Sequence, residues 1–187
     1  LYYQPMKSDS DALLMQRAAQ DDAAFAELFD RYYPRAVNVA YRMLGDRDLA
    51  EDTAMEAFAR IYESRAGYRP TAAFGTYLYR VVSNLSINAC RRRSHIRLAP
   101  LDDTHPAPAS DGPGAGVQQA EFANAVRAAV LALPERQRMA LVLTRYEGLC
   151  HADAAEVIGV STGAVESLLH RAKCSMRKSL EHHLTQH

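Results

Sequence analysis

Residues 133–173 read LPERQRMALVLTRYEGLCHADAAEVIGVSTGAVESLLHRAK, and this stretch decides the fold of the C-terminal half of the chain. A short helix with one apolar side is predicted by Ala154, Ala155 and Ile158. Gly159 ends that helix, because glycine tolerates the left-handed backbone of a helix terminus. Ser161 is a typical cap for a following helix. The pattern of short helix, tight turn and second helix predicts a helix-turn-helix.

The second helix of this motif carries two stripes. Its inner stripe is apolar and recurs at i, i+3, i+4 and i+7, at Val165, Leu168, Leu169 and Ala172. Its outer stripe consists of hydrogen-bonding side chains, as a helix lying in a DNA major groove requires. We expect duplex DNA to be contacted by Ser161, Thr162, Gly163, Glu166, Ser167, His170, Arg171 and Lys173. The alternative is an ordinary solvated helix whose charges contact nothing.

Charge is balanced over the whole chain but uneven along it. The 22 Lys and Arg match the 22 Asp and Glu, which excludes a polybasic coat for nucleic acid. Residues 98–120 contain three acidic and no basic residues, whereas basic residues are slightly in excess on both sides. DNA affinity must therefore come from local patches, and we expect weak binding by the chain alone and a partner that supplies the rest.

We expect an all-α fold of two small helical domains, residues 11–97 and 119–184, joined by a flexible linker. The linker, residues 98–118, reads LAPLDDTHPAPASDGPGAGVQ; it is acidic and rich in Pro and Gly, and it cannot form a packed core. We expect such a tether to let the two domains sample many arrangements. Apolar helical stripes divide the first domain into helices at residues 25–32, 37–44, 50–61 and 74–89, with Pro34 suited to the first turn of the second.

The last of these helices also has a polar stripe. Tyr77, Arg80, Asn84 and Asn88 recur at intervals of three and four, and Arg91, Arg92 and Arg93 follow. The preceding loop, residues 67–74, adds Tyr68, Arg69 and Phe74. Cations that follow a backbone, interleaved with rings and amides that meet exposed bases, suit single-stranded DNA. Alternatively, the arginines only satisfy a helix C-terminus, where cations are favoured.

The helix at residues 50–61 begins in an acidic segment. Its exposed side chains would repel DNA, so a functional role would require a basic protein surface. Compensation of the helix dipole is the alternative. The acidic side chains concerned are Asp46, Asp48, Glu51, Asp52 and Glu56.

Other chemistry is sparse. Cys90, Cys150 and Cys174 are odd in number and show no paired spacing, which indicates reduced thiols. The pairs His170–Cys174 and Cys150–His151 offer too few ligands for a structural zinc site, so we expect no metal and no other cofactor. The sequence contains no phosphate-binding loop and no nucleophile–base pair; we expect neither an enzyme nor a small-molecule substrate. Without an export signal or a long apolar run, we expect a cytoplasmic protein.

Several unlinked motifs in a fixed order carry a resemblance to a known family. These are AFAELFDRYYPRAVNVAYRMLGDRDLAEDTAMEAF (residues 24–58), FGTYLYRVVSNLSINACRRR (74–93), LPERQRMALVL (133–143) and LLHRAK (168–173). Together they resemble the extracytoplasmic-function (ECF, group IV) sigma factors of bacterial RNA polymerase, over residues 11–184.

The resemblance implies a role for each part. The first domain would be sigma region 2, which binds the −10 element, captures a flipped base with the 67–74 loop and docks its acidic helix on the β′ clamp helices of core polymerase. The second would be region 4, which reads the −35 element and contacts the β flap. The linker would thread toward the active-site cleft. An anti-sigma factor, often membrane-anchored in this family, would be a further partner.

This sequence departs from the family pattern at four positions. Met55 stands in place of a usual Gln, Tyr77 of a Trp and Asn88 of an Asp. Glu166 stands where a basic or small residue is frequent, and it favours a cytosine amino group over a phosphate. A different class of protein, a stand-alone helix-turn-helix regulator, would bind duplex DNA tightly by itself and as a dimer.

Overall fold

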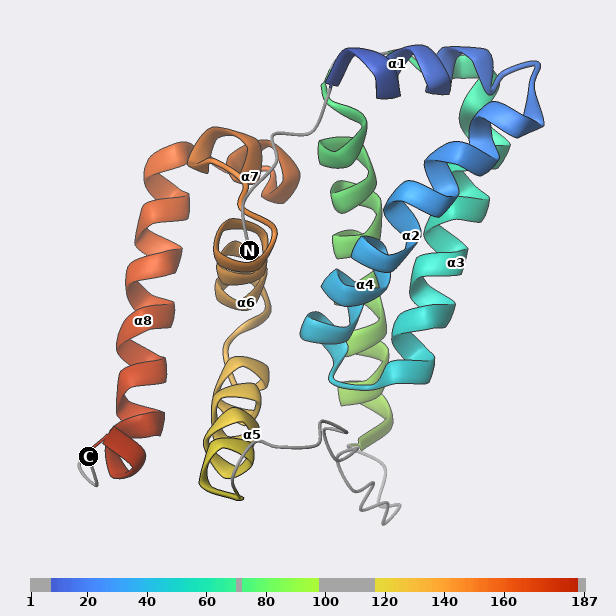
Figure 1. Ribbon diagram of the computed structural model, residues 1–187. Coiled ribbons are helices and arrows are strands. Elements are labelled where there is room, and N and C mark those ends of the chain that lie inside the picture. The colour runs from blue at the N-terminus through green and yellow to red at the C-terminus, as the bar shows by residue number, and fades with distance from the viewer. Residues whose placement is uncertain (1–7, 70–71, 98–116, 185–187) are drawn as a thin grey trace.

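The computed structural model describes residues 8–69, 72–97 and 117–184 (Figure 1). Within these ranges the ordered elements are all helical, which confirms the expected all-α fold. None of the helices there has both the length and the apolar character that a membrane span needs. The expected linker lies almost entirely outside the described residues.

The N-terminal block comprises α1 (Ser8–Arg17), α2 (Asp22–Leu44), α3 (Arg47–Ser64), a 3-10 turn (Arg65–Gly67) and α4 (Phe74–Arg97). Helices α2, α3 and α4 pack side by side, and α1 lies across one end of them (Figure 1). Their facing stripes are buried, which removes large apolar side chains from water. The core includes Leu28, Tyr32, Met43, Phe58, Ile61 and Leu78.

Helix α2 differs from the expectation. Pro34 lies inside one continuous helix rather than in the first turn of a new one. Proline in a helix interior removes one backbone hydrogen bond. Here apolar residues are buried both before and after Pro34, at Leu28 and Val37 among others, so packing on both halves keeps the helix continuous.

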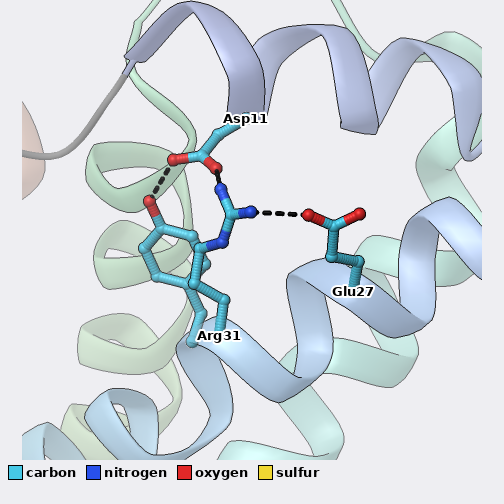
Figure 2. A network of polar contacts seen from close by, with 4 residues as sticks. Asp11, Glu27 and Arg31 are labelled. Carbon is cyan, nitrogen blue, oxygen red and sulfur yellow. Dashed lines mark hydrogen bonds and ion pairs between the residues drawn. The ribbon is translucent and has the colours of Figure 1, made fainter.

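A buried carboxylate fixes α1 on α2 (Figure 2). Asp11, 2% exposed, accepts hydrogen bonds from the Tyr32 hydroxyl and from the Arg31 guanidinium. Arg31 also bonds Glu27 at 2.6 Å, on the outer side of the same helix. Burial and the neighbouring Asp11 carboxylate raise the pKa of Tyr32 far above its usual range.

The C-terminal block comprises α5 (Val117–Leu131), α6 (Glu135–Leu141), a π-helical turn (Val142–Tyr146), α7 (His151–Ile158) and α8 (Thr162–Leu184). Helix α5 begins two residues earlier than the expected domain boundary. Its Phe122 is 42% exposed, whereas Ala129 and Leu133 further along are buried. The core of this block includes Met139, Leu143, Ala154, Val157 and Val165.

The two blocks pack against each other. Helix α7 contacts α4, and α5 and α6 contact α2. The C-terminal block lies beside the N-terminal block in Figure 1. Arg138 of α6 is 9% exposed and donates to the carbonyl oxygen of Met43, near the C-terminal end of α2, as well as to the carbonyls of Leu131 and Leu133 in its own block. The Arg42 guanidinium lies 4.3 Å from the centre of the Tyr146 ring. The structure thus describes one packed arrangement of the two blocks.

Candidate nucleic-acid interface

The helix-turn-helix has the expected local geometry. Helix α7 ends at Gly159, whose φ of 73° is left-handed and whose N–H donates to Ala155 at 2.9 Å. The Ser161 hydroxyl accepts the N–H of Ala164 at 3.2 Å, which confirms the predicted cap of α8. Val165 and Ala172 are fully buried, so the inner stripe holds α8 on its block and leaves the outer stripe free for a ligand.

The outer stripe of α8 is open to solvent. Every residue expected at duplex DNA is exposed: Ser161, Thr162, Gly163, Glu166, Ser167, His170, Arg171 and Lys173. Several are also oriented by local bonds, since Ser167 donates to the carbonyl of Gly163 at 3.0 Å and Arg171 to that of Ser167 at 3.2 Å. Donors, acceptors and cations on one exposed helix face can meet both base edges and phosphates.

Glu166 interacts with the neighbouring helix. Its carboxylate lies 3.5 Å from the Nδ1 atom of His151, the first residue of α7. Both side chains are exposed, so the pair contributes little to stability. It directs the Glu166 carboxylate along the surface that a major groove would cover.

The polar stripe of α4 is divided between solvent and the other block. Asn84 and Asn88 are exposed. They line a hollow between α4, α6 and α7, together with Arg91, Arg136 and Ile158. Tyr77 is half-buried, and the Arg80 guanidinium forms an ion pair with Glu156 of α7. Arg80 therefore faces the C-terminal block in this arrangement, whereas Asn84 and Asn88 stay accessible to solvent.

The loop before α4 forms one side of a shallow pocket that is lined by aromatic side chains. The rings of Tyr68 and Tyr77 lie 5.5 Å apart, and with Arg69 and Arg80 they line a hollow of about 240 Å³. Burial raises the pKa of Tyr68. Residues 70 and 71 of this loop lie outside the described residues. Such a hollow can hold a base between rings and cations.

Phe74 requires a correction. Its side chain is fully buried, and its ring packs edge-on against Tyr32 at 5.1 Å. Apolar periodicity places Phe74 at the start of the α4 core stripe, and this packing prevails over the expected contact with DNA. In this structure the ring is part of the core between α2 and α4.

The basic end of α4 meets acidic neighbours. Arg91 forms an ion pair with Glu135 at 3.4 Å and Arg93 with Asp46 at 3.7 Å, while Arg92 is exposed. All three side chains lie near the surface.

The acidic helix α3 presents an outer face. Asp48, Asp52, Met55 and Glu56 are exposed, with Met55 at 51%. Asp46 caps the helix by accepting the N–H of Leu49 at 3.1 Å, and Glu51 pairs with Arg47 at 2.6 Å. An exposed methionine among carboxylates suits a basic protein surface that also has an apolar centre.

Sequence reasoning missed the acidic residues that join the blocks. Glu156 on α7 binds Arg80, and Glu147, after the π-helical turn, accepts a hydrogen bond from Tyr79. Either glutamate, taken by itself, is indistinguishable from an ordinary solvated charge. Arg138, which lies in the polar run ERQR at the start of α6, gave no local signal either, although its side chain is 9% exposed.

Metal ligands do not cluster in the described part of the chain, where no three His, Cys, Asp or Glu side chains come close enough to hold an ion. His170 and Cys174 approach to 3.7 Å as an isolated pair. The three cysteines are free thiols; Cys150 and Cys174 are exposed, and burial raises the pKa of half-buried Cys90.

Comparison with known proteins places both blocks. Residues 28–96 match the family model of sigma-70 region 2, and residues 123–175 match that of sigma-70 region 4. The chain is 33% identical to the ECF RNA polymerase sigma factor SigE of Mycolicibacterium smegmatis; the match covers 89% of this chain and 66% of SigE, just under two thirds of its length. It is 31% identical to the ECF sigma factor SigW of Bacillus subtilis, over 86% of this chain and 90% of SigW.

A solved structure has the same fold. The sigma factor RpoE of Bartonella quintana, crystallised with the anti-sigma factor NepR, aligns with a TM-score of 0.68 at 18% identity, covering 84% of this chain and 96% of RpoE.

Proposed function

The chain belongs to the ECF sigma factors of bacterial RNA polymerase, and we propose how its blocks divide the task of directing polymerase to promoters. The C-terminal block reads the −35 element as duplex DNA. The N-terminal block binds the −10 element as a single strand and docks on the polymerase. The protein supplies binding energy for strand opening and no catalytic group of its own.

The −35 reading rests on α8. The residues expected at duplex DNA, from the Ser161 cap to Lys173, are all exposed along one side of α8, and this is the observation that carries the proposal. Thr162, Glu166, Ser167 and His170 lie toward the N-terminal half, which in this motif meets base edges. Arg171 and Lys173 follow and suit phosphates. Glu166 accepts a hydrogen bond from the amino group of a cytosine.

The −10 reading rests on α4 and its loop. The hollow beside Tyr68, Tyr77 and Arg69 takes a flipped base, since unpaired bases stack on rings and cations. Asn84, Asn88 and the arginines at 91–93 follow the strand away from that base. Phe74 is part of the core and does not touch DNA.

Polymerase docking rests on α3. The β′ clamp helices are the basic partner for the carboxylates around Met55, and replacement of the family's usual Gln by Met55 gives this contact an apolar centre. The C-terminal block contacts the β flap. Because polymerase works there, the site of action is the cytoplasm.

An anti-sigma factor is a further partner. The support is twofold: family members are commonly held inactive in this way, and the RpoE structure with which this chain aligns contains an anti-sigma factor. The anti-sigma factor would cover the same DNA- and polymerase-binding faces until a signal releases it.

The test is run-off transcription from a promoter library by bacterial core polymerase, with and without the full chain. We expect initiation from a selected subset only when the protein is present, with a base preference at each element. Glu166→Ala should relax the preference at one −35 position by about tenfold, because one good base contact is lost. Lys173→Ala is the matched control: it should weaken all promoters uniformly and reduce the salt dependence.

A different result would indicate the alternative function. Flat transcription, together with a dimer that shifts duplex DNA without polymerase, would establish a stand-alone regulator instead.

A further inference from the structure

The DNA-facing side of α4 is occupied by an acidic residue of the other block. The Arg80 guanidinium donates to the Glu156 carboxylate at 2.8 Å and to the Glu156 carbonyl oxygen at 3.3 Å. Arg80 belongs to the polar stripe of α4 from which the sequence predicts strand contacts. A carboxylate at 2.8 Å is the geometry that a DNA phosphate oxygen would have at the same guanidinium.

A second contact lies one residue away. The Tyr79 hydroxyl, on a side chain 1% exposed, donates to the Glu147 carboxylate at 2.9 Å. Burial raises the pKa of both groups. Consecutive residues of α4, Tyr79 and Arg80, therefore bind two acidic side chains of the C-terminal block.

Glu156 also closes the base-binding hollow. Among the described residues it is the one from the C-terminal block that lines this hollow, together with Tyr68, Tyr77 and Arg80 of the N-terminal block. Within the described part of the chain, the buried Tyr68 hydroxyl and Arg80 Nε atom have no hydrogen-bond partner. Polar groups left in this state are suited to a ligand that replaces Glu156.

We propose that the Glu156 face of α7 is an intramolecular docking surface for the DNA-binding side of α4, with Glu156 taking the place of a DNA phosphate at Arg80. The free protein is thereby closed to −10 DNA. This inference rests on the proposed role of α4 as the strand-binding helix.

The closed form leaves the other working faces open. Met55 and the carboxylates of α3 stay exposed, and so does the outer stripe of α8. Polymerase can therefore engage the closed protein first and separate the blocks afterwards, which exposes Arg80 only where promoter DNA is about to open. The Arg80–Glu156 pair is 43% exposed on each side, so a phosphate can displace it readily.

The test compares Glu156→Gln with Asp153→Asn in the full chain. Both variants remove one negative charge from α7, but exposed Asp153 bonds only within its own block, to Cys150 at 3.2 Å. Binding of a fluorescent random-sequence single strand of about twelve nucleotides is measured by anisotropy. Small-angle scattering reports opening independently of DNA; a compact chain of this length has a radius of gyration of about 16 Å.

We expect Glu156→Gln to bind the single strand about two- to fivefold more tightly and to increase the radius of gyration, while Asp153→Asn matches the wild type. Arg80→Ala should open the chain as well, yet bind DNA more weakly, because it removes the shared partner. Equal affinities for the two α7 variants, or a wild-type chain that is already extended, would overturn the inference.

A separate assay tests the proposed function. If that function is wrong, core polymerase shows no promoter-dependent transcription with this protein. The Glu156→Gln variant should retain such transcription in full.

Discussion

Single buried charges decide more of the stability of this protein than its many surface pairs. Asp11 and Glu27 bind the same guanidinium, that of Arg31, from two sides. The Asp11 side chain is 3% exposed and the Glu27 side chain 56%. Removing a partner from a buried pair leaves polar groups without water or protein, whereas an exposed pair is replaced by solvent.

Asp11→Ala should therefore lower the free energy of unfolding by about 2–4 kcal/mol, because it leaves the Tyr32 hydroxyl without its acceptor. Glu27→Ala should lower it by only about 0.3–0.5 kcal/mol. Urea denaturation of the full chain measures both. Equal losses in the two variants would show that Asp11 is solvated in the native protein.

Residue patterns predicted the exposed face of α8 well, because a helix has one period and Val165 and Ala172 fix which side is inward. They were less reliable at Phe74, where the same ring is consistent with an aromatic contact to DNA and with a core position. They did not predict the contact between Glu156 and Arg80, because the sequence does not give the distance between two charged residues that lie 76 positions apart.

Helices α2 and α7 end in the same way, but the surroundings of the two ends differ. Both α2 and α7 terminate at a left-handed glycine, Gly45 with φ 74° and Gly159 with φ 73°. A β-carbon at Gly45 would lie 2.6 Å from the Leu131 side chain of the other block, whereas one at Gly159 would meet nothing within 4 Å. The first helix end is thus part of the contact between blocks.

Gly159→Ala should lower the free energy of unfolding by about 1–2 kcal/mol, the cost of the left-handed backbone alone. Gly45→Ala should lose about a further 1 kcal/mol, because Leu131 must leave its preferred rotamer. Thermal unfolding compares the two variants. Scattering should in addition show partial opening for Gly45→Ala and none for Gly159→Ala; identical behaviour would place Leu131 away from Gly45 in solution.

Helix existence was predictable, and helix continuity was not. The stripes at residues 25–32 and 37–44 both exist, but they form the single helix α2 across Pro34. Local chemistry favours a break at proline, and the buried residues on either side outweigh it. Long-range packing of this kind is not encoded in a local window.

The contact between the two blocks contains a carboxyl group, that of Glu147, whose pKa depends on whether the blocks are packed together. Glu147 faces Tyr79, Arg42 and Arg35; burial raises its pKa although these partners oppose the rise. Separation of the blocks returns the carboxyl to water and to its ordinary pKa. The closed form therefore binds a proton more tightly, so closure is favoured most below the ordinary pKa of glutamate and is weakened as the pH rises through the raised value.

Acidification from neutral pH should thus shift the chain toward the closed form, by about tenfold in the closing constant for each unit by which the pKa is raised. Scattering across the pH range measures the shift. Glu147→Gln keeps an acceptor for Tyr79 and removes the titration, so it should stay closed at neutral pH and lose this dependence. A dependence unchanged in Glu147→Gln would assign it to other groups, such as the histidines.

Packing of the blocks was beyond reach of the sequence for a physical reason. The composition of residues 98–118 indicates only that the connection allows movement, and contacts such as Tyr79–Glu147 join segments 68 positions apart. Each contact is weak by itself, and their sum depends on a fit of surfaces that no periodicity describes.

The contact from Arg138 to the carbonyl end of α2 bears on how such proteins can diverge. Because a side chain of one half completes a helix of the other, the halves are not freely interchangeable parts. A chimera that joins residues 1–116 to the C-terminal half of a distant relative would retain both folds but not this match. During evolution, substitutions in α2 should therefore be accompanied by substitutions in α6 and α7, and exchange of one half alone should be disfavoured.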